Sequence, residues 1–343
     1  MIEFISFGFG LNIVLFIAAA AVITYAGVKV SHLADELADR TGLGEVIAGA
    51  LFVGASTSLP GAITSVSTAV QGFPALSIGN ALGGLTAQTL FIAVADLFYR
   101  RANLEHAAAT PVALAQGLLL LALLATAMLG ASVPGLSVLG VHPVSYVLPV
   151  GYVFGLLLLR SVHKNAMWEV KITDETREET SDAEDSDDDR SNGKLWGLFG
   201  VYAALTAVAG YVVGEASIAL VALTGVDQTL FGTTFTAIAN SLPELVTAIA
   251  AVRIGAVGLA VGDIIGGNAF EILFLSLADF ATPAPIYLDM KATDQATGLF
   301  AALMVIVVLL GMLKREKSGL FNIGFESVLV FGLYGLSVLV LFL

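Results

Sequence analysis

Ten long apolar runs divide this 343-residue chain, and they constrain its fold more than any other feature. They lie at about 11–30, 44–70, 75–98, 110–130, 143–160, 195–213, 228–252, 256–280, 296–313 and 323–342. A membrane-spanning helix needs about 20 mostly apolar residues and satisfies its own backbone where no water is present. The chain is 57% hydrophobic and only 13% charged, which excludes a soluble enzyme and a nucleic-acid-binding protein. We therefore predict an all-α integral membrane protein with ten transmembrane helices.

The basic residues indicate how these helices are oriented. Of the 15 Lys and Arg residues, all but Lys291 fall in odd-numbered connections between the runs. Because cytoplasmic loops carry an excess of Lys and Arg, these connections are predicted to be cytoplasmic. Both termini would then lie outside, and the chain would be a multi-pass protein of the cell (plasma) membrane.

A strongly acidic segment separates two sets of five runs. Its core reads DETREETSDAEDSDDDR at 174–190 and contains no aromatic residue. Such a segment buries too little apolar surface to fold, so residues 161–194 are predicted to be a disordered cytoplasmic linker. A calcium-sensing role is the alternative, but the spacing of an EF-hand is absent. The domains expected are a first transmembrane half (1–160), the linker, and a second transmembrane half (195–343).

The two halves are related by an internal repeat. Shifting the chain by 183 residues aligns 41–96 with 224–279 without a gap, and 17 of 56 positions are identical. The repeats are therefore placed at about 41–97 and 224–280. Because each half has five predicted helices, the halves would cross the membrane in opposite directions. Secondary transporters use such inverted repeats to build a midplane site with two alternate openings.

The motif Ser-Leu-Pro occurs at equivalent places in both repeats, at 58–60 and 241–243. Proline within a helix removes a backbone hydrogen bond, here one that would use the carbonyl of Ser56 or of Ala239. We expect a kinked helix at both places, with the freed carbonyls lining a cavity or binding an ion. The neighbouring hydroxyl and amide oxygens belong to Thr57, Ser58, Asn240 and Ser241.

Two acidic residues lie within predicted spans of the second half. Glu244 follows the second proline, and Glu271 comes 27 residues later, where their first-half equivalents are Gly61 and Gln88. Carboxylates at membrane depth are costly unless they are paired, protonated or ion-bound. Together with neutral oxygens they suit a hard cation such as Ca²⁺ or Na⁺, whereas the lack of nearby His or Cys argues against zinc or copper.

Other paired positions are given a structural interpretation. The glycine pairs 83–84 and 266–267 are expected to allow close helix packing. Asn80 and Asp263 are expected either to line an access path or to cap a span. Asp96 and Asp279 are expected at the membrane interface, where their helices end.

At these motifs the chain resembles the cation/calcium exchanger superfamily, whose best-known branch is the sodium/calcium exchanger. The matching segments are Ser-Leu-Pro-Glu at 241–244 with Gly-Asp-Ile-Ile-Gly-Gly-Asn-Ala-Phe-Glu at 262–271, and their partners at 58–61 and 79–88. The resemblance implies a cation site formed by Thr57, Ser58, Gln88, Asn240, Ser241, Glu244 and Glu271. The chain departs from the family pattern at Gly61, which replaces a glutamate, and at Gly84 and Gly267, which replace serines. Water is expected to replace the missing ligand at Gly61.

The leading functional hypothesis is a secondary antiporter that exchanges Na⁺ for Ca²⁺ by alternating access, without a cofactor and without enzymatic activity. A proton-coupled Ca²⁺ or monovalent-cation exchanger of the same fold is the first alternative. A divergent member that does not transport is the second, because Gly61 leaves the site with two carboxylates. The lipid bilayer is the expected environment, and a monomer is sufficient for the proposed site.

Overall fold

The computed structural model describes residues 4–41, 54–99, 102–166, 170–171, 191–317, 319 and 323–342. Within these residues the chain is helical, and no β-strand is present. The longer helices are α1 (Gly8–Thr41), α4 (Leu59–Val70), α5 (Pro74–Asp96), α7 (Pro111–Ser132), α8 (Pro143–Lys164), α9 (Asn192–Thr224), α11 (Ala237–Ile254), α12 (Val257–Glu271), α13 (Leu273–Ala281), α14 (Ala292–Lys314) and α15 (Phe325–Val340). The short ones are η1 (Phe4–Phe7), α3 (Gly54–Thr57), α6 (Leu104–Ala108), α10 (Gln228–Phe231), the π-helical η3 (Gly232–Thr236) and η4 (Ile286–Asp289).

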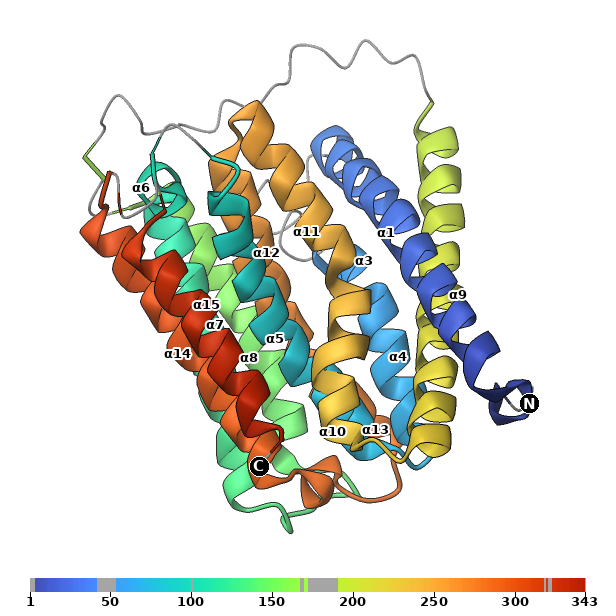
Figure 1. Ribbon diagram of the computed structural model, residues 1–343. Coiled ribbons are helices and arrows are strands. Elements are labelled where there is room, and N and C mark those ends of the chain that lie inside the picture. The colour runs from blue at the N-terminus through green and yellow to red at the C-terminus, as the bar shows by residue number, and fades with distance from the viewer. Residues whose placement is uncertain are drawn as a thin grey trace.

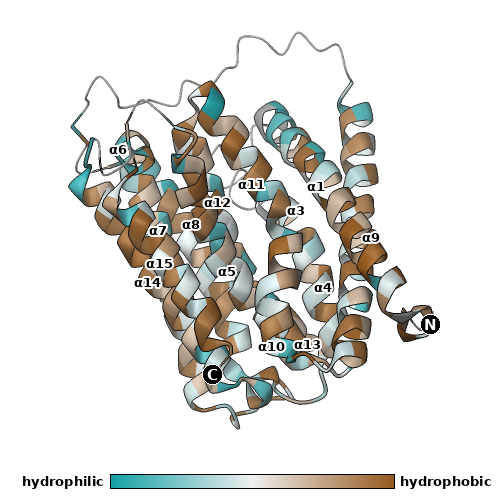
Figure 2. Cartoon of the chain, viewed as in Figure 1, coloured by the Kyte–Doolittle hydropathy of each residue, from teal (hydrophilic) through white to brown (hydrophobic). Residues whose placement is uncertain are grey.

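Eight helical stretches in the described part are long and apolar enough to cross a membrane. Two further apolar helices, α4 and α15, are shorter than the spans expected at 44–70 and 323–342. Residues 42–53, which belong to the first of these spans, lie outside the described residues. Figure 2 shows hydrophobic residues over most of the outer helices, as a protein surrounded by lipid requires. The chain is thus an all-helical, multi-pass membrane protein.

Two groups of helices flank the central helix α5. Helices α1 and α9 pack along each other on one side, and α7, α8, α14 and α15 form the other side (Figure 1). Between them, α5 contacts α11, α12, α14 and α15. The central position explains why α5 is buried along almost its whole length, with polar residues on several faces.

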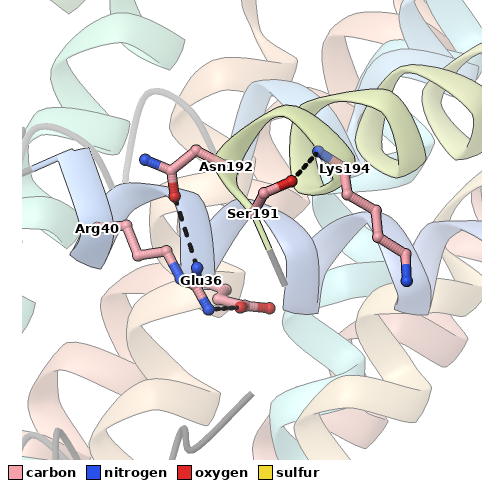
Figure 3. Close-up of polar contacts among 5 residues, drawn as sticks. All are labelled: Glu36, Arg40, Ser191, Asn192 and Lys194. Carbon is pink, nitrogen blue, oxygen red and sulfur yellow. Dashed lines mark hydrogen bonds and ion pairs between the residues drawn. The ribbon is translucent and has the colours of Figure 1, made fainter. Parts of the chain in front are cut away.

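The end of α8 and the beginning of α9 lie at the opposite end of the molecule from the first and last described residues (Figure 1). In Figure 1 the two termini are at the lower end, whereas α8 ends and α9 begins at the upper end. Helix α9 is capped by Ser191, whose side chain accepts a hydrogen bond from the Lys194 amide (Figure 3). Arg40 near the end of α1 donates to Asn192 at 3.5 Å and pairs with Glu36 at 2.7 Å, so α1 and α9 are joined at this end. The core of the predicted linker, 172–190, lies outside the described residues.

Asp96 ends α5 and is fully buried within the protein. Its carboxylate accepts hydrogen bonds from the Leu104 amide at 2.8 Å, the Gly324 amide at 3.2 Å and the Ser327 hydroxyl at 2.8 Å. The donors from 324 and 327 belong to the second half. Three donors offset the loss of hydration, which explains how the carboxylate is buried at a helix end.

Asp279 is the equivalent residue at the opposite end of the molecule. It is fully buried and accepts from the Ile286 amide at 2.7 Å, the His142 amide at 2.8 Å and the Ser145 hydroxyl at 2.6 Å. The donors from 142 and 145 belong to the first half. Each aspartate therefore fixes the beginning of the last helix of the other half, α15 or α8.

Candidate functional site

The two Ser-Leu-Pro motifs have different backbones. At the first, α3 ends at Thr57 and α4 begins at Leu59, so the helix is interrupted at Ser58. At the second, α11 continues from Ala237 to Ile254 with Pro243 inside it. The helix is therefore interrupted only at the first motif, whereas the second motif lies in a continuous helix that is preceded by the π-helical turn η3.

Two glycines bring α1 and α9 against these prolines. A Cβ at Gly27 of α1 would lie 2.6 Å from Pro243 Cγ, and one at Gly210 of α9 would lie 2.7 Å from Pro60 Cα. Only glycine permits such approaches. The sequence analysis missed this pair, although Gly27 and Gly210 are themselves 183 positions apart.

The two predicted carboxylates lie close together in the interior. Glu244 and Glu271 are 5% and 3% exposed, and their carboxyl groups interact electrostatically. The Thr57 hydroxyl makes a hydrogen bond to Glu244, so residues of both halves meet here. This proximity is what a shared cation site requires.

Gln88 and Ser241 complete the arrangement from opposite halves. The Gln88 amide donates to the Ser241 hydroxyl at 3.2 Å. A Cβ at Gly84 would lie 2.5 Å from Glu271 Cδ, and one at Gly267 would lie 3.5 Å from Gln88 Oε1. The glycines at the departures from the family pattern therefore face Glu271 and Gln88, and the Glu271 carboxyl occupies the space that a Cβ at Gly84 would need.

Asn240 is turned toward a different set of partners. Its amide donates to Asn80 Oδ1 at 2.9 Å, and its Oδ1 accepts from Thr64 at 3.4 Å. Asn80 in turn donates to the Gly61 carbonyl at 3.1 Å and to Ser65 at 2.8 Å. Asn80 thus joins α4, α5 and α11 and does not cap a span; Asp263, its equivalent, is partly exposed.

The position of Gly61 is filled by an aromatic ring. A Cβ there would lie 2.7 Å from Phe274 Cε2 and 3.8 Å from Asn240 Cβ. Phe274 is fully buried at the start of α13. The expectation that water replaces the missing carboxylate is therefore wrong, because the ring takes the space that a ligand would need.

Several oxygen atoms at this place have no hydrogen-bond partner. They are Ser58 Oγ, Gln88 Oε1, Glu244 Oε2 and Glu271 Oε2. Buried polar atoms are nearly always paired, so a cluster of unpaired acceptors is the donor set expected of a site for a positive ion. In the described part of the chain no three His, Asp or Glu side chains converge on one point, so any cation must be held by two carboxylates and neutral oxygens.

Comparison with known proteins gives a family match over both halves. The profile of the family described as "Sodium/calcium exchanger protein" matches residues 11–159 and 194–343. Inner membrane protein YrbG of Escherichia coli K12 is 34% identical over 126 residues, which cover 36% of this chain and 38% of that protein. Sodium/calcium exchanger MaX1 of Methanosarcina acetivorans is 35% identical over 103 residues, 28% of this chain and 29% of that protein. The chain thus aligns with less than two fifths of the length of either relative.

Solved structures of exchangers share the fold. The H⁺/Ca²⁺ exchanger CAX superposes with a TM-score of 0.65 at 13% identity, covering 96% of this chain and 84% of that one. A structure of the sodium-calcium exchanger NCX_Mj soaked with Na⁺ and Sr²⁺ gives a TM-score of 0.60 at 17% identity, covering 96% and 98%. These likenesses establish the architecture around the site.

Proposed function

Because the chain belongs to the sodium/calcium exchanger family, we propose that it exchanges Na⁺ for Ca²⁺ across the cell membrane by alternating access. The observation that carries the proposal is the electrostatic interaction of the buried carboxyls of Glu244 and Glu271 beside unpaired oxygens from both halves. Two carboxylates neutralise one Ca²⁺ or two Na⁺, so the two ions would compete for the same oxygens. Competition of this kind is the simplest source of coupling between opposite fluxes.

The proposed transport site comprises Glu244 and Glu271 as charged ligands, with Thr57, Ser58, Gln88 and Ser241 as neutral ones. Asn240 is assigned a supporting role, since its amide and oxygen are engaged by Asn80 and Thr64. Because Gly61 stands where the family has a glutamate, and Phe274 packs against it, this site has fewer charges than the resemblance implies.

We propose in addition that the two halves are five-helix repeats of inverted topology. The support is a series of reciprocal contacts: Gly27 with Pro243 and Gly210 with Pro60, Gly84 with Glu271 and Gly267 with Gln88. The hydrogen bonds of Asp96 and Asp279 are reciprocal in the same way, because each aspartate accepts from a backbone amide of the other half. Fourteen of the 15 basic residues support placing the linker in the cytoplasm and both termini outside.

Proton coupling is the second candidate, and it is favoured by the small number of charges at the site. A buried glutamate can release a proton when a cation arrives. The solved exchangers of this fold include one named for H⁺/Ca²⁺ exchange.

The test is ⁴⁵Ca²⁺ uptake into proteoliposomes that contain the full chain. An imposed Na⁺ gradient should drive uptake, and a pH gradient alone should not. Uptake driven only by the pH gradient would replace Na⁺ by H⁺ as the coupled ion. A Glu244→Gln variant serves as the control, and unchanged gradient-driven flux in this variant would remove Glu244 from the mechanism.

A further inference from the structure

A second group of buried carboxyls lies at the end of the molecule where α6 meets α15. Asp96 is 0% exposed, and Glu105 and Glu326 are each 1% exposed. They come from α5, α6 and α15, so segments far apart in the sequence supply them. The group is separate from Glu244 and Glu271, and the proposed transport function does not use it.

Within this group Asp96 acts only as an acceptor. It receives hydrogen bonds from two backbone amides and from Ser327. Three donors favour the ionised form of a carboxyl group. These three donors pair Asp96 without a proton of its own, so the other two acids are left to pair with each other.

Glu105 and Glu326 make a hydrogen bond to each other, carboxyl to carboxyl. Such a bond requires a proton on one of them, because an ionised carboxylate only accepts. Their remaining oxygens, Glu105 Oε2 and Glu326 Oε2, are buried without a hydrogen-bond partner. Gly311 and Gly324 pack directly against the side chain of Glu326 and close the space around it.

Among the described residues, the charges that act on the pair are themselves acidic. The described ionisable side chains on the packed elements are Asp96 on α5, His106 on α6, Asp263 and Glu271 on α12, Asp294 and Lys314 on α14, Arg315, Glu316 and Lys317 just beyond it, and Tyr334 on α15. Those that act electrostatically on the pair are acids, Asp96 and Glu316. The Arg315 guanidinium donates to the carbonyls of His106 and Lys171.

The opposite end of the molecule has no such pair. Asp279 has the same set of donors as Asp96, but the positions equivalent to Glu105 and Glu326 are Leu288 and Pro143. The capping role of the aspartate is thus met without extra acids. The acidic pair is an addition at one end and not a requirement of the fold.

We propose that Glu105 and Glu326 form a proton-binding site, distinct from the transport site, in which one shared proton fastens α6 to the beginning of α15. Loss of the proton would leave three carboxylates in one buried space and separate the two helices. The site would thereby make the packing at this end depend on pH.

The direction of the pH effect follows from Glu105. Burial raises its pKa well above the usual 4.5, and the charges of Asp96 and Glu326 raise it further. The folded protein therefore holds a proton that the unfolded chain releases near pH 4.5. Stability is greatest below that pH and is lost as pH rises through the folded pKa, by up to about tenfold in the folding equilibrium per pH unit.

The test is infrared spectroscopy of the full chain in liposomes at neutral pH, following the C=O stretch of protonated carboxyl groups. Glu105→Gln should remove one such band, since glutamine still donates to Glu326 but carries no titrating proton. Glu316→Gln, an acid beside the pair, should remove none. The band should persist when saturating Ca²⁺ is added, whereas any protonated carboxyl of the transport site should respond to Ca²⁺.

Thermal unfolding provides the second measurement. The apparent Tm of the unmodified chain should fall as pH is raised, and Glu105→Gln should flatten this dependence. Identical spectra for the unmodified chain and Glu105→Gln would overturn the proposal. If Glu105→Gln does not fold, the Glu326→Gln variant and a pH titration of the infrared band in the unmodified chain replace it as the test. Loss of the band near the ordinary carboxyl pKa would contradict the proposed proton site.

Discussion

The two sides of the candidate site share reciprocal packing contacts but not their charge. The first-half side presents Thr57, Ser58 and Gln88, all neutral, and the second-half side presents both carboxylates. The packing around them is nevertheless reciprocal, as the glycine contacts of the two halves show. The comparison teaches that the two halves can keep equivalent packing contacts while their ion-binding residues differ. The packing involves equivalent positions in both halves, whereas the proposed site takes both of its carboxylates from the second half.

The largest expected effect comes from removing a carboxylate on the charged side. Glu271→Gln should weaken Ca²⁺ binding by about 2–5 kcal/mol, about 30-fold or more, because a buried ionic partner is lost. Ser58→Ala on the neutral side should cost only about 1 kcal/mol. Calorimetric titration of purified protein with Ca²⁺ measures both. Equal losses on the two sides would contradict the asymmetry.

The next effect tests whether Phe274 keeps the first-half side neutral. Gly61→Glu alone should destabilise the protein by about 1–3 kcal/mol, since its side chain would overlap the Phe274 ring. The double variant with Phe274→Ala provides room for the third carboxylate. We expect it to recover part of the stability and to bind Ca²⁺ more tightly than either single variant, as measured by thermal unfolding and titration. A single Gly61→Glu variant of unchanged stability would show that the ring does not exclude the side chain.

A smaller effect distinguishes the two glycines that face the site. Gly84→Ala places a methyl group against the Glu271 carboxyl and should shift it, weakening Ca²⁺ binding by about tenfold, about 1.4 kcal/mol. Gly267→Ala is the matched control, because its Cβ would make an ordinary contact of 3.5 Å with Gln88. Isothermal titration of the two variants side by side is the measurement. A stronger effect at Gly267 would reverse the assignment of the sides.

The smallest effect concerns an ion pair that only the second half can form. Burial alone would raise the pKa of Asp227, but Lys291 and the Leu230 amide hold it below the usual 3.8. Its contribution is therefore present above pH 3.8 and is lost as pH falls through the folded pKa. Because Lys291 and Asp227 are exposed and lie 2.7 Å apart, Lys291→Ala should cost less than about 1 kcal/mol in thermal unfolding at neutral pH. The first-half equivalents, Gly44 and Ala108, have no charge to lose.

Hydropathy was enough to predict an all-helical membrane protein, because transfer of apolar residues into lipid depends on composition. It did not predict that Asp96 and Asp279 would be buried, since two of the three donors of each come from segments more than 130 residues away. The break at Ser58 was predicted from Pro60, but the continuity of α11 through Pro243 was not. Proline removes one hydrogen bond in either case, and the tertiary surroundings decide whether the helix continues.

The residues of the site that could be predicted from the sequence were the charged ones. Glu244 and Glu271 were identified because an acid at membrane depth is costly without a role. Gly27, Gly210 and Phe274 were not identified, since glycines and aromatic residues are common in spans and only their contacts distinguish them. Asn240 was predicted as a ligand from its position, and only its hydrogen bonds reveal how it is held.

The hydrogen bonds that Asp96 and Asp279 accept from the opposite half have a consequence for biosynthesis. When the first half has been inserted during translation, Asp96 still lacks the Gly324 and Ser327 donors, and the beginning of α8 lacks its carboxylate acceptor. Neither half can complete its own helix ends, so maturation waits for the last helix to leave the ribosome. A polypeptide of one half alone would leave each aspartate with one of its three donors, the amide of Leu104 or of Ile286.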